Sequence, residues 1–128
     1  MPGPRRPVRV LIAEDQSIFV DALMLLLETD ERVEVVGTAA NGAEAVDRAL
    51  SARADVVVMD MDMPVLDGLE ATRRLRKALP EARVIVVSGL DPAVHEQRAL
   101  EAGATSYLLK GRIGAEMVDE ILAASSGP

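Results

Sequence analysis

Residues 56–64 read Val-Val-Val-Met-Asp-Met-Asp-Met-Pro, and their pattern is the strongest indication of the fold class. Its first four residues are all apolar, whereas a strand with one face in water alternates apolar and polar residues. A strand at 56–60 is therefore expected to be covered on both faces. It ends in an acid, Asp60, and a loop containing Pro64 follows.

Short β-branched runs alternate with longer runs of helical spacing on both sides of this strand. Such alternation favours right-handed βαβ crossovers, which build a parallel sheet with helices on both faces. We therefore predict a three-layer, doubly wound, five-stranded α/β domain. The expected strands are 8–13, 33–39, 56–60, 83–88 and 107–109, and the expected helices are 17–29, 41–53, one that ends near 79, 92–102 and 115–124.

The length and composition narrow the possibilities further. A chain of 128 residues suits one domain, and we expect a disordered tail at 1–7, the domain at 8–124 and the start of a linker at 125–128. The absence of cysteine excludes disulfides, thiolate metal sites and cysteine nucleophiles, and fits a reducing cytoplasm. Fourteen basic and 21 acidic side chains give a formal charge of −7, which disfavours binding to nucleic acid and anionic lipid. No apolar run is long enough to cross a membrane.

Polar residues stand where four of the five predicted strands end. The first strand is followed by Glu14 and Asp15, the third ends in Asp60, the fourth in Ser88, and the fifth is followed by Lys110. Ligands of open α/β sheets bind outside the carboxyl ends of the strands, so these side chains should converge. The second strand ends in residues 38–40, Thr-Ala-Ala, as expected of an edge strand away from the site.

Carboxylates gathered at one edge repel one another, and a cation or a proton must relieve the repulsion. An all-oxygen set of ligands suits Mg²⁺, which in turn attracts phosphate oxygens. One carboxylate could then act as a nucleophile and become an aspartyl phosphate. The hydroxyl of Ser88 and the ammonium of Lys110 would hold the transferred oxygens, since phosphoryl transfer depends mainly on positioning and charge neutralisation.

Six motifs, in this order and at this spacing, carry a resemblance to a known family. They are Leu-Ile-Ala-Glu-Asp at 11–15, Val-Val-Met-Asp-Met-Asp-Met-Pro at 57–64, Asp-Gly at 67–68, Val-Val-Ser-Gly at 86–89, Ala-Gly-Ala at 102–104 and Tyr-Leu-Leu-Lys at 107–110. Together they resemble bacterial response-regulator receiver domains of the CheY-like superfamily. Residues 35–37, 69–73 and 108–110 look most like the NarL/FixJ subgroup. The resemblance implies a flavodoxin-like fold with strand order 2-1-3-4-5.

The resemblance also implies a role for each residue of the site. Asp60 would be the phosphoacceptor, and Glu14 and Asp15 would be the acidic pair that holds Mg²⁺ with it. The Asp62 backbone carbonyl would be a further metal ligand, and Lys110 would be the lysine that pairs with the phosphate. Ser88 would be the switch hydroxyl and Tyr107 the switch aromatic.

A receiver of this kind accepts a phosphoryl group from a sensor histidine kinase in a cytoplasmic two-component phosphorelay. It catalyses only its own phosphorylation and dephosphorylation, and it changes its interaction surface. NarL/FixJ receivers precede a helix-turn-helix domain that binds DNA and regulates transcription. We expect that domain to be missing from this chain. The receiver itself is not expected to bind nucleic acid, and any contact with DNA would be made by the missing domain. A homodimer is expected through the apolar first and last helices, or through the face of the fourth helix, fifth strand and fifth helix.

Two residues depart from the subgroup's pattern. Asp62 is an acid where the subgroup often carries a basic or uncharged residue, and we expect its charge to alter the phosphoryl lifetime or the access of the donor. Gly111 follows Lys110 where Asp is common.

Other interpretations fit parts of the same sequence. Asp60-Met61-Asp62 matches the Asp-x-Asp motif of haloacid-dehalogenase-type phosphatases, but Glu14 and Asp15 are then unexplained and Pro64 stands where those enzymes carry a hydroxyl residue. A receiver without phosphorylation chemistry is a further alternative, against which the intact set of site residues counts. Asp67, before Gly68, is expected to be a helix cap.

Overall fold

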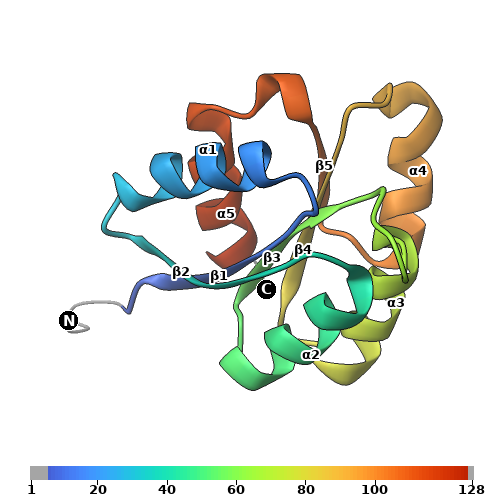
Figure 1. The fold of residues 1–128 in the computed structure, drawn as a ribbon, viewed down its shortest axis with the longest axis horizontal. Coiled ribbons are helices and arrows are strands. Elements are labelled where there is room, and N and C mark those ends of the chain that lie inside the picture. The colour runs from blue at the N-terminus through green and yellow to red at the C-terminus, as the bar shows by residue number, and fades with distance from the viewer. Residues whose placement is uncertain (1–5, 127–128) are drawn as a thin grey trace.

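The computed structural model describes residues 6–126, which form a five-stranded parallel sheet between two layers of helices (Figure 1). The strand order is β2-β1-β3-β4-β5, so the predicted topology is confirmed. The strands are β1 (Val8–Ala13), β2 (Val33–Ala39), β3 (Val56–Asp60), β4 (Arg83–Ser88) and β5 (Ser106–Leu109). The helices are α1 (Ser17–Glu28), α2 (Gly42–Ala52), α3 (Gly68–Ala78), α4 (Pro92–Ala102) and α5 (Ala115–Ser126), with a 3₁₀ turn, η1 (Lys110–Arg112), after β5.

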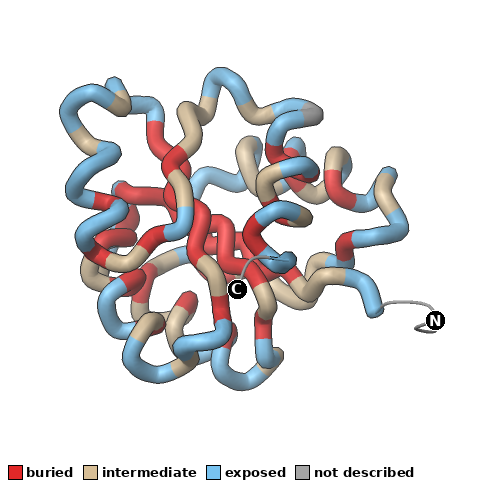
Figure 2. The backbone as a smooth tube through the Cα atoms, turned by 180° about the vertical axis from the view of Figure 1, so that it is seen from behind, coloured by how far each residue is buried: buried red, intermediate tan, exposed pale blue. Residues whose placement is uncertain are grey.

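The sheet separates two apolar cores. Helices α1 and α5 cover one face, and α2, α3 and α4 cover the other (Figure 1). Every residue of β3 is buried, as predicted for a strand covered on both faces, because β1 and β4 flank it and its apolar side chains enter both cores. Figure 2 shows the same arrangement as a band of buried backbone through the centre of the molecule.

The observed elements differ from the predicted ones mainly at their ends. Helix α5 continues to Ser126, so the expected linker does not begin at residue 125. The Ser125 hydroxyl donates to the Leu122 carbonyl and the Ser126 hydroxyl to the Ala123 carbonyl, and these local bonds fit the helical backbone. Residues 1–5 of the expected tail at 1–7, and residues 127–128 of the expected linker, lie outside the described residues. Lys110 opens η1, a turn that the sequence did not predict.

A side-chain cap fixes the start of α3, and a glycine fixes the end of α4. Asp67 caps α3, with its Oδ1 accepting from the Glu70 amide at 2.9 Å, which confirms its predicted role. Gly103 ends α4 with a φ of 110°, a left-handed conformation that favours glycine. Asp67 therefore marks the end of the loop between β3 and α3 at the carboxyl edge of the sheet, and Gly103 begins the connection from α4 to β5 at the opposite edge.

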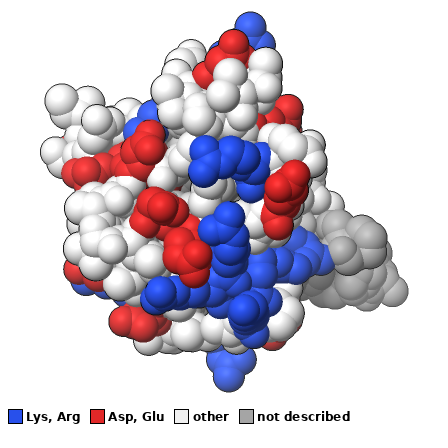
Figure 3. Space-filling view, turned by 90° about the vertical axis from the view of Figure 1, so that its right-hand side faces the viewer, with Lys and Arg blue, Asp and Glu red and all other residues white. Residues whose placement is uncertain are grey.

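The charges are spread unevenly over the helices. Four basic side chains and one acidic side chain lie on α3, whereas α5 carries three acidic side chains and no basic one. Figure 3 looks onto the side of the molecule formed by α3 and α4, and it shows Lys and Arg gathered in a patch on the lower half. The formal charge of −7 therefore does not describe every face of the molecule. The basic residues of α3 are Arg73, Arg74, Arg76 and Lys77.

Among residues 6–126, no helix combines the length and the apolar character needed to span a bilayer.

Candidate functional site

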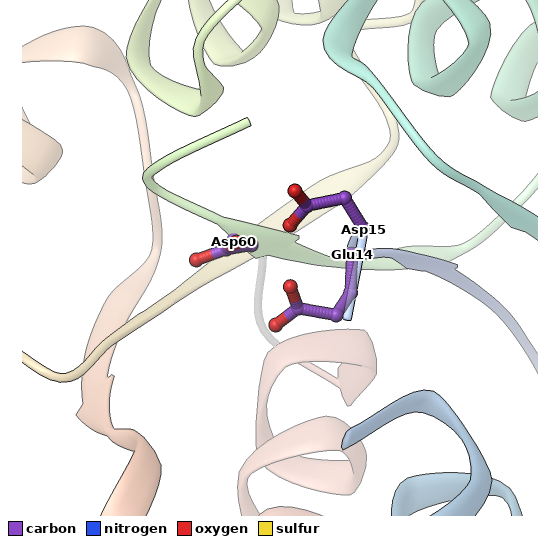
Figure 4. Close-up of side chains that lie close together, drawn as sticks. All are labelled: Glu14, Asp15 and Asp60. Carbon is purple, nitrogen blue, oxygen red and sulfur yellow. The ribbon is translucent and has the colours of Figure 1, made fainter. Parts of the chain in front are cut away.

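Three carboxylates meet at the carboxyl edge of the sheet. Asp60 is the last residue of β3, and Glu14 and Asp15 follow β1, which is the neighbour of β3 in the sheet. One carboxylate oxygen from each residue lies within 4.8 Å of those from the other two. Figure 4 shows Glu14 and Asp15 turned toward the end of β3, where Asp60 lies. The predicted convergence of these residues is confirmed.

Lys110 completes the group of charges. Its Nζ lies 2.5 Å from Glu14 Oε1 and 3.4 Å from Asp60 Oδ1. It also lies 3.4 Å from Gln16 Oε1 and 4.8 Å from the centre of the Phe19 ring, a cation–π geometry. The sequence placed Lys110 at this edge, but nothing in its pattern identified Gln16 and Phe19, because both contacts depend on how α1 begins.

Burial and mutual repulsion perturb the two inner carboxyls. Glu14 and Asp60 are both 3% exposed. Burial, together with the hydrogen bond to Glu14 and its charge, raises the pKa of Asp60 to about 7. Burial alone would raise the pKa of Glu14, but hydrogen bonds with Asp60 and Lys110 outweigh it and lower that pKa. Without a cation the pair therefore shares a proton near neutral pH.

The residues present fit a hard divalent cation. The cluster offers carboxylate oxygens only, and no His or Cys of the described chain belongs to it. Two of the three carboxylates are buried where their repulsion is poorly screened, and a cation would relieve it as well as a proton does. Mg²⁺ suits such a set because it binds one or two carboxylates and keeps several waters.

Ser88 and Tyr107, the two predicted switch residues, are joined through one backbone unit. The Ser88 Oγ accepts from the Leu90 amide at 3.0 Å, and the Tyr107 hydroxyl donates to the Leu90 carbonyl at 2.7 Å. Ser88 and Tyr107 are both buried; Ser88 ends β4, and Tyr107 lies within the neighbouring strand β5, paired with Val86. The tyrosine ring thus already occupies an inner position in this structure.

Asp62 lies beside the site with its side chain exposed. Its amide donates to Asp60 Oδ1 at 3.4 Å, a long hydrogen bond. The role of its carbonyl as a metal ligand stays a prediction. Close by, Gly68 packs so tightly that a Cβ would lie 2.1 Å from the Asp60 carbonyl oxygen. The sequence indicated this glycine only as the start of a helix, since the close approach belongs to the tertiary structure.

Comparisons with known proteins agree with this geometry. The sequence profile of the family described as "Response regulator receiver domain" matches residues 10–122. The chain is 38% identical over 120 residues to the transcriptional regulatory protein LiaR of Bacillus subtilis, an alignment that covers 94% of this chain and 57% of LiaR. It is 37% identical over 114 residues to the response regulator GacA of Pseudomonas viridiflava, covering 89% of this chain and 53% of GacA. The chain thus spans about half the length of these curated relatives.

A solved structure gives the same result. The signal receiver domain of the putative response regulator NarL from Mycobacterium tuberculosis superposes with a TM-score of 0.92 at 30% identity, over 97% of this chain and all of that one. These relatives also support the resemblance to the NarL/FixJ subgroup. The site and the comparisons leave one conclusion: the chain belongs to the response regulator receiver domain family, which serves signal transduction in two-component systems.

Proposed function

We propose that this receiver accepts a phosphoryl group on Asp60, delivered by a sensor histidine kinase or a small acyl phosphate. The observation that carries the proposal is the meeting of Glu14, Asp15 and Asp60 within 4.8 Å, with Lys110 beside them. An ionised Asp60 oxygen attacks the phosphorus, and the bond from phosphorus to the donor's leaving group breaks. Asp60 is held at the end of a fully buried strand, so its position is fixed before the donor arrives.

Glu14, Asp15 and Asp60 would hold Mg²⁺, with the Asp62 backbone carbonyl as a further ligand. When bound, the ion neutralises negative charge on the transferred oxygens. Ion binding also favours the charged form of Asp60, which is the form that can act as a nucleophile. Glu14 and Asp15 therefore serve both to bind the ion and to set the charge state of their neighbour.

Lys110 and Ser88 would hold the oxygens of the new phosphoryl group. Lys110 Nζ is 3.4 Å from Asp60 Oδ1 and has to move only from its contact with Glu14. If Ser88 turns its hydroxyl toward the phosphoryl group, the Leu90 amide loses its acceptor, and the Leu90 carbonyl holds Tyr107. A change at Asp60 thereby reaches the face formed by α4 and β5, and its size is limited by the difference in phosphate contacts between the two states.

The test is incubation with Mg²⁺ and acetyl phosphate followed by intact mass measurement. We expect one phosphoryl adduct on the wild-type chain and none on Asp60→Asn, which keeps the size of the side chain. Asp67→Asn provides a matched control, because that residue caps α3 outside the cluster and asparagine caps equally well. An adduct that persists in Asp60→Asn would overturn the assignment of the phosphoacceptor.

We further propose that the donor, and a second copy of the chain, approach over the apolar surface near the site. Ile18 and Leu25 on α1 are 85% and 68% exposed, and Val94 on α4 is 63% exposed. Ile18 and Leu25 support a contact through α1, and Val94 supports a contact through the face of α4, β5 and α5. Sedimentation that shows only monomer, with and without a phosphoryl analogue, would exclude self-association at the concentrations used. A cytoplasmic location and a DNA-binding output domain elsewhere in the protein complete the proposal.

A further inference from the structure

The turn between β2 and α2, residues 39–42, touches both loops that carry the acids of the site. The Ala39 carbonyl accepts from the Glu14 amide at 2.9 Å. At the other end of the turn, the Gly42 amide donates to the Leu66 carbonyl at 3.1 Å, in the loop between Asp60 and α3. The carboxyl end of β2, which the sequence placed away from the site, is therefore hydrogen-bonded through this turn to the backbone of both acidic loops.

The turn is itself firmly held. The Asn41 side chain accepts from the Glu44 amide at 2.9 Å, and the Glu44 carboxylate accepts from the Ala40 amide at 3.0 Å. This reciprocal pair resembles a capping box, with the carboxylate reaching the amide of the residue before the cap, and it fixes the first turn of α2. The turn can therefore act as a fixed support for the loops that it contacts.

Gly42 allows an approach that no other residue would permit. A Cβ at this position would lie 2.1 Å from the Leu66 carbonyl oxygen and 2.8 Å from its carbonyl carbon. These are backbone atoms, so no side-chain rotation could relieve the overlap, and the loop itself would have to move. Of the described glycines, only Gly42 and Gly68 meet backbone this closely, and both contact the segment from Asp60 to α3.

The loop between Asp60 and α3 has a strained backbone next to the contact between Gly42 and Leu66. Val65 has a φ of 69°, a left-handed conformation that is unfavourable for a β-branched residue. It is 83% exposed, so its own side chain gains little from burial. A tight turn, with the Leu66 amide donating to the Pro64 carbonyl at 2.7 Å, brings the Leu66 carbonyl to Gly42. Such conformations persist where the surroundings enforce them, and here the Gly42 contact does so.

We propose that the β2–α2 turn is a positioning element of the phosphorylation site, and that Gly42 is the residue through which it sets the loop carrying Asp60 and Asp62. The inference rests on the proposed function, because what it positions is the Mg²⁺ site. Displacing Leu66 would shift the loop 61–67. The two ends of this loop are held together, because the Gly68 amide donates a hydrogen bond to the Met61 carbonyl at 3.0 Å. The shift would fall on the backbone around Asp62.

The test compares Mg²⁺ binding by calorimetry for Gly42→Ala and for Gly114→Ala, where an added Cβ meets nothing within 4 Å. We expect Gly42→Ala to weaken Mg²⁺ binding by about 10- to 100-fold, the usual effect of losing support for metal ligands, and the control to bind normally. A rescue experiment adds Val65→Gly, because glycine at 65 can absorb the displacement. The double variant should recover most of the lost affinity at a temperature where all variants are fully folded, so that a general gain in stability does not account for the recovery.

Normal Mg²⁺ affinity in Gly42→Ala, or a loss that Val65→Gly leaves unchanged, would overturn the inference. Failure of the wild-type chain to bind Mg²⁺ would instead overturn the proposed function. If Gly42→Ala does not fold, hydrogen exchange of the Gly42 amide in the wild-type chain decides the matter. Mg²⁺ should slow that exchange, and an unchanged rate would contradict the inference.

Discussion

The Asp60 carboxyl lies beside a second buried carboxyl, and the pair makes stability depend on pH when no Mg²⁺ is bound. The folded protein holds a proton on Asp60 up to about pH 7, whereas the ordinary pKa is 3.8. The free energy of unfolding should therefore fall as pH rises between these two values. The lowered pKa of Glu14 makes the free energy of unfolding rise with pH, but only below its ordinary pKa of 4.5. Between pH 4.5 and about 7, Asp60 therefore determines how the free energy of unfolding changes with pH.

The variant Asp60→Asn should lose this pH dependence. Without Mg²⁺ we expect it to be more stable than wild type at pH 8 by on the order of 2 kcal/mol, since one pKa unit corresponds to about 1.4 kcal/mol. At pH 5 the difference should shrink, because wild-type Asp60 is then protonated in the folded state. Urea unfolding in the presence of a chelator measures both values. Parallel pH profiles for the two proteins would show that Asp60 is not the group that titrates.

Asp62 adds an exposed negative charge beside the phosphoacceptor. Because small acyl phosphates are anionic, we expect Asp62→Asn to be phosphorylated about two- to fivefold faster by acetyl phosphate, matching the ~0.5–1 kcal/mol of an exposed charge interaction. The lifetime of the phosphoryl group should change as well. Asp67→Asn is the control, since it removes the same charge from the same loop and keeps a capping residue. Equal rates of phosphorylation and dephosphorylation in all three proteins would remove this role for Asp62.

Among the elements, the junction of α3 and α4 depends on one glycine. Gly103 has a φ of 110°, and a Cβ there would lie 2.6 Å from Arg76 Cγ. Arg76 cannot swing away freely, because its guanidinium donates to the carbonyls of Pro80 and Ala82. Gly103→Ala should therefore lower the free energy of unfolding by at least about 1–2 kcal/mol, the cost of a left-handed alanine.

Chemical denaturation measures this cost, with Gly111→Ala as the control because an added Cβ there meets nothing within 4 Å. Phosphorylation should survive in Gly103→Ala, since the junction lies away from the acidic cluster. Equal stability of the two alanine variants would contradict the importance of this junction.

For the whole molecule, cation binding should couple to global stability. The folded chain gathers the three acids and the unfolded chain does not, so Mg²⁺ should stabilise the fold by about 2.7 kcal/mol at 100 times its Kd. A thermal melt should show a rise in Tm of roughly 4 °C per kcal/mol. The rise should be lost in Asp15→Asn and kept in Asp21→Asn, an exposed acid on α1 outside the cluster. Equal Tm shifts in both variants would mean that the stabilising ion binds elsewhere.

The order of the elements, and the residues at the carboxyl edge of the sheet, could be predicted from the sequence alone. Apolar runs such as 56–59 mark strands through local pattern, and parallel connectivity brings the ends of those strands together whatever the details. Glu14, Asp15, Asp60 and Lys110 could therefore be placed in one site before any distance was known.

How those groups pair, and what supports them, depends on the packing of the folded chain. The contact of Lys110 with Glu14, the raised pKa of Asp60 and the link from Ser88 to Tyr107 through Leu90 all depend on distances of a few ångströms between separate loops. The approach of Gly42 to Leu66 is of the same kind. The hydrophobic pattern determines which face of a helix or strand is buried. Backbone contacts between loops form only when the layers pack together, so no local sequence pattern predicts them.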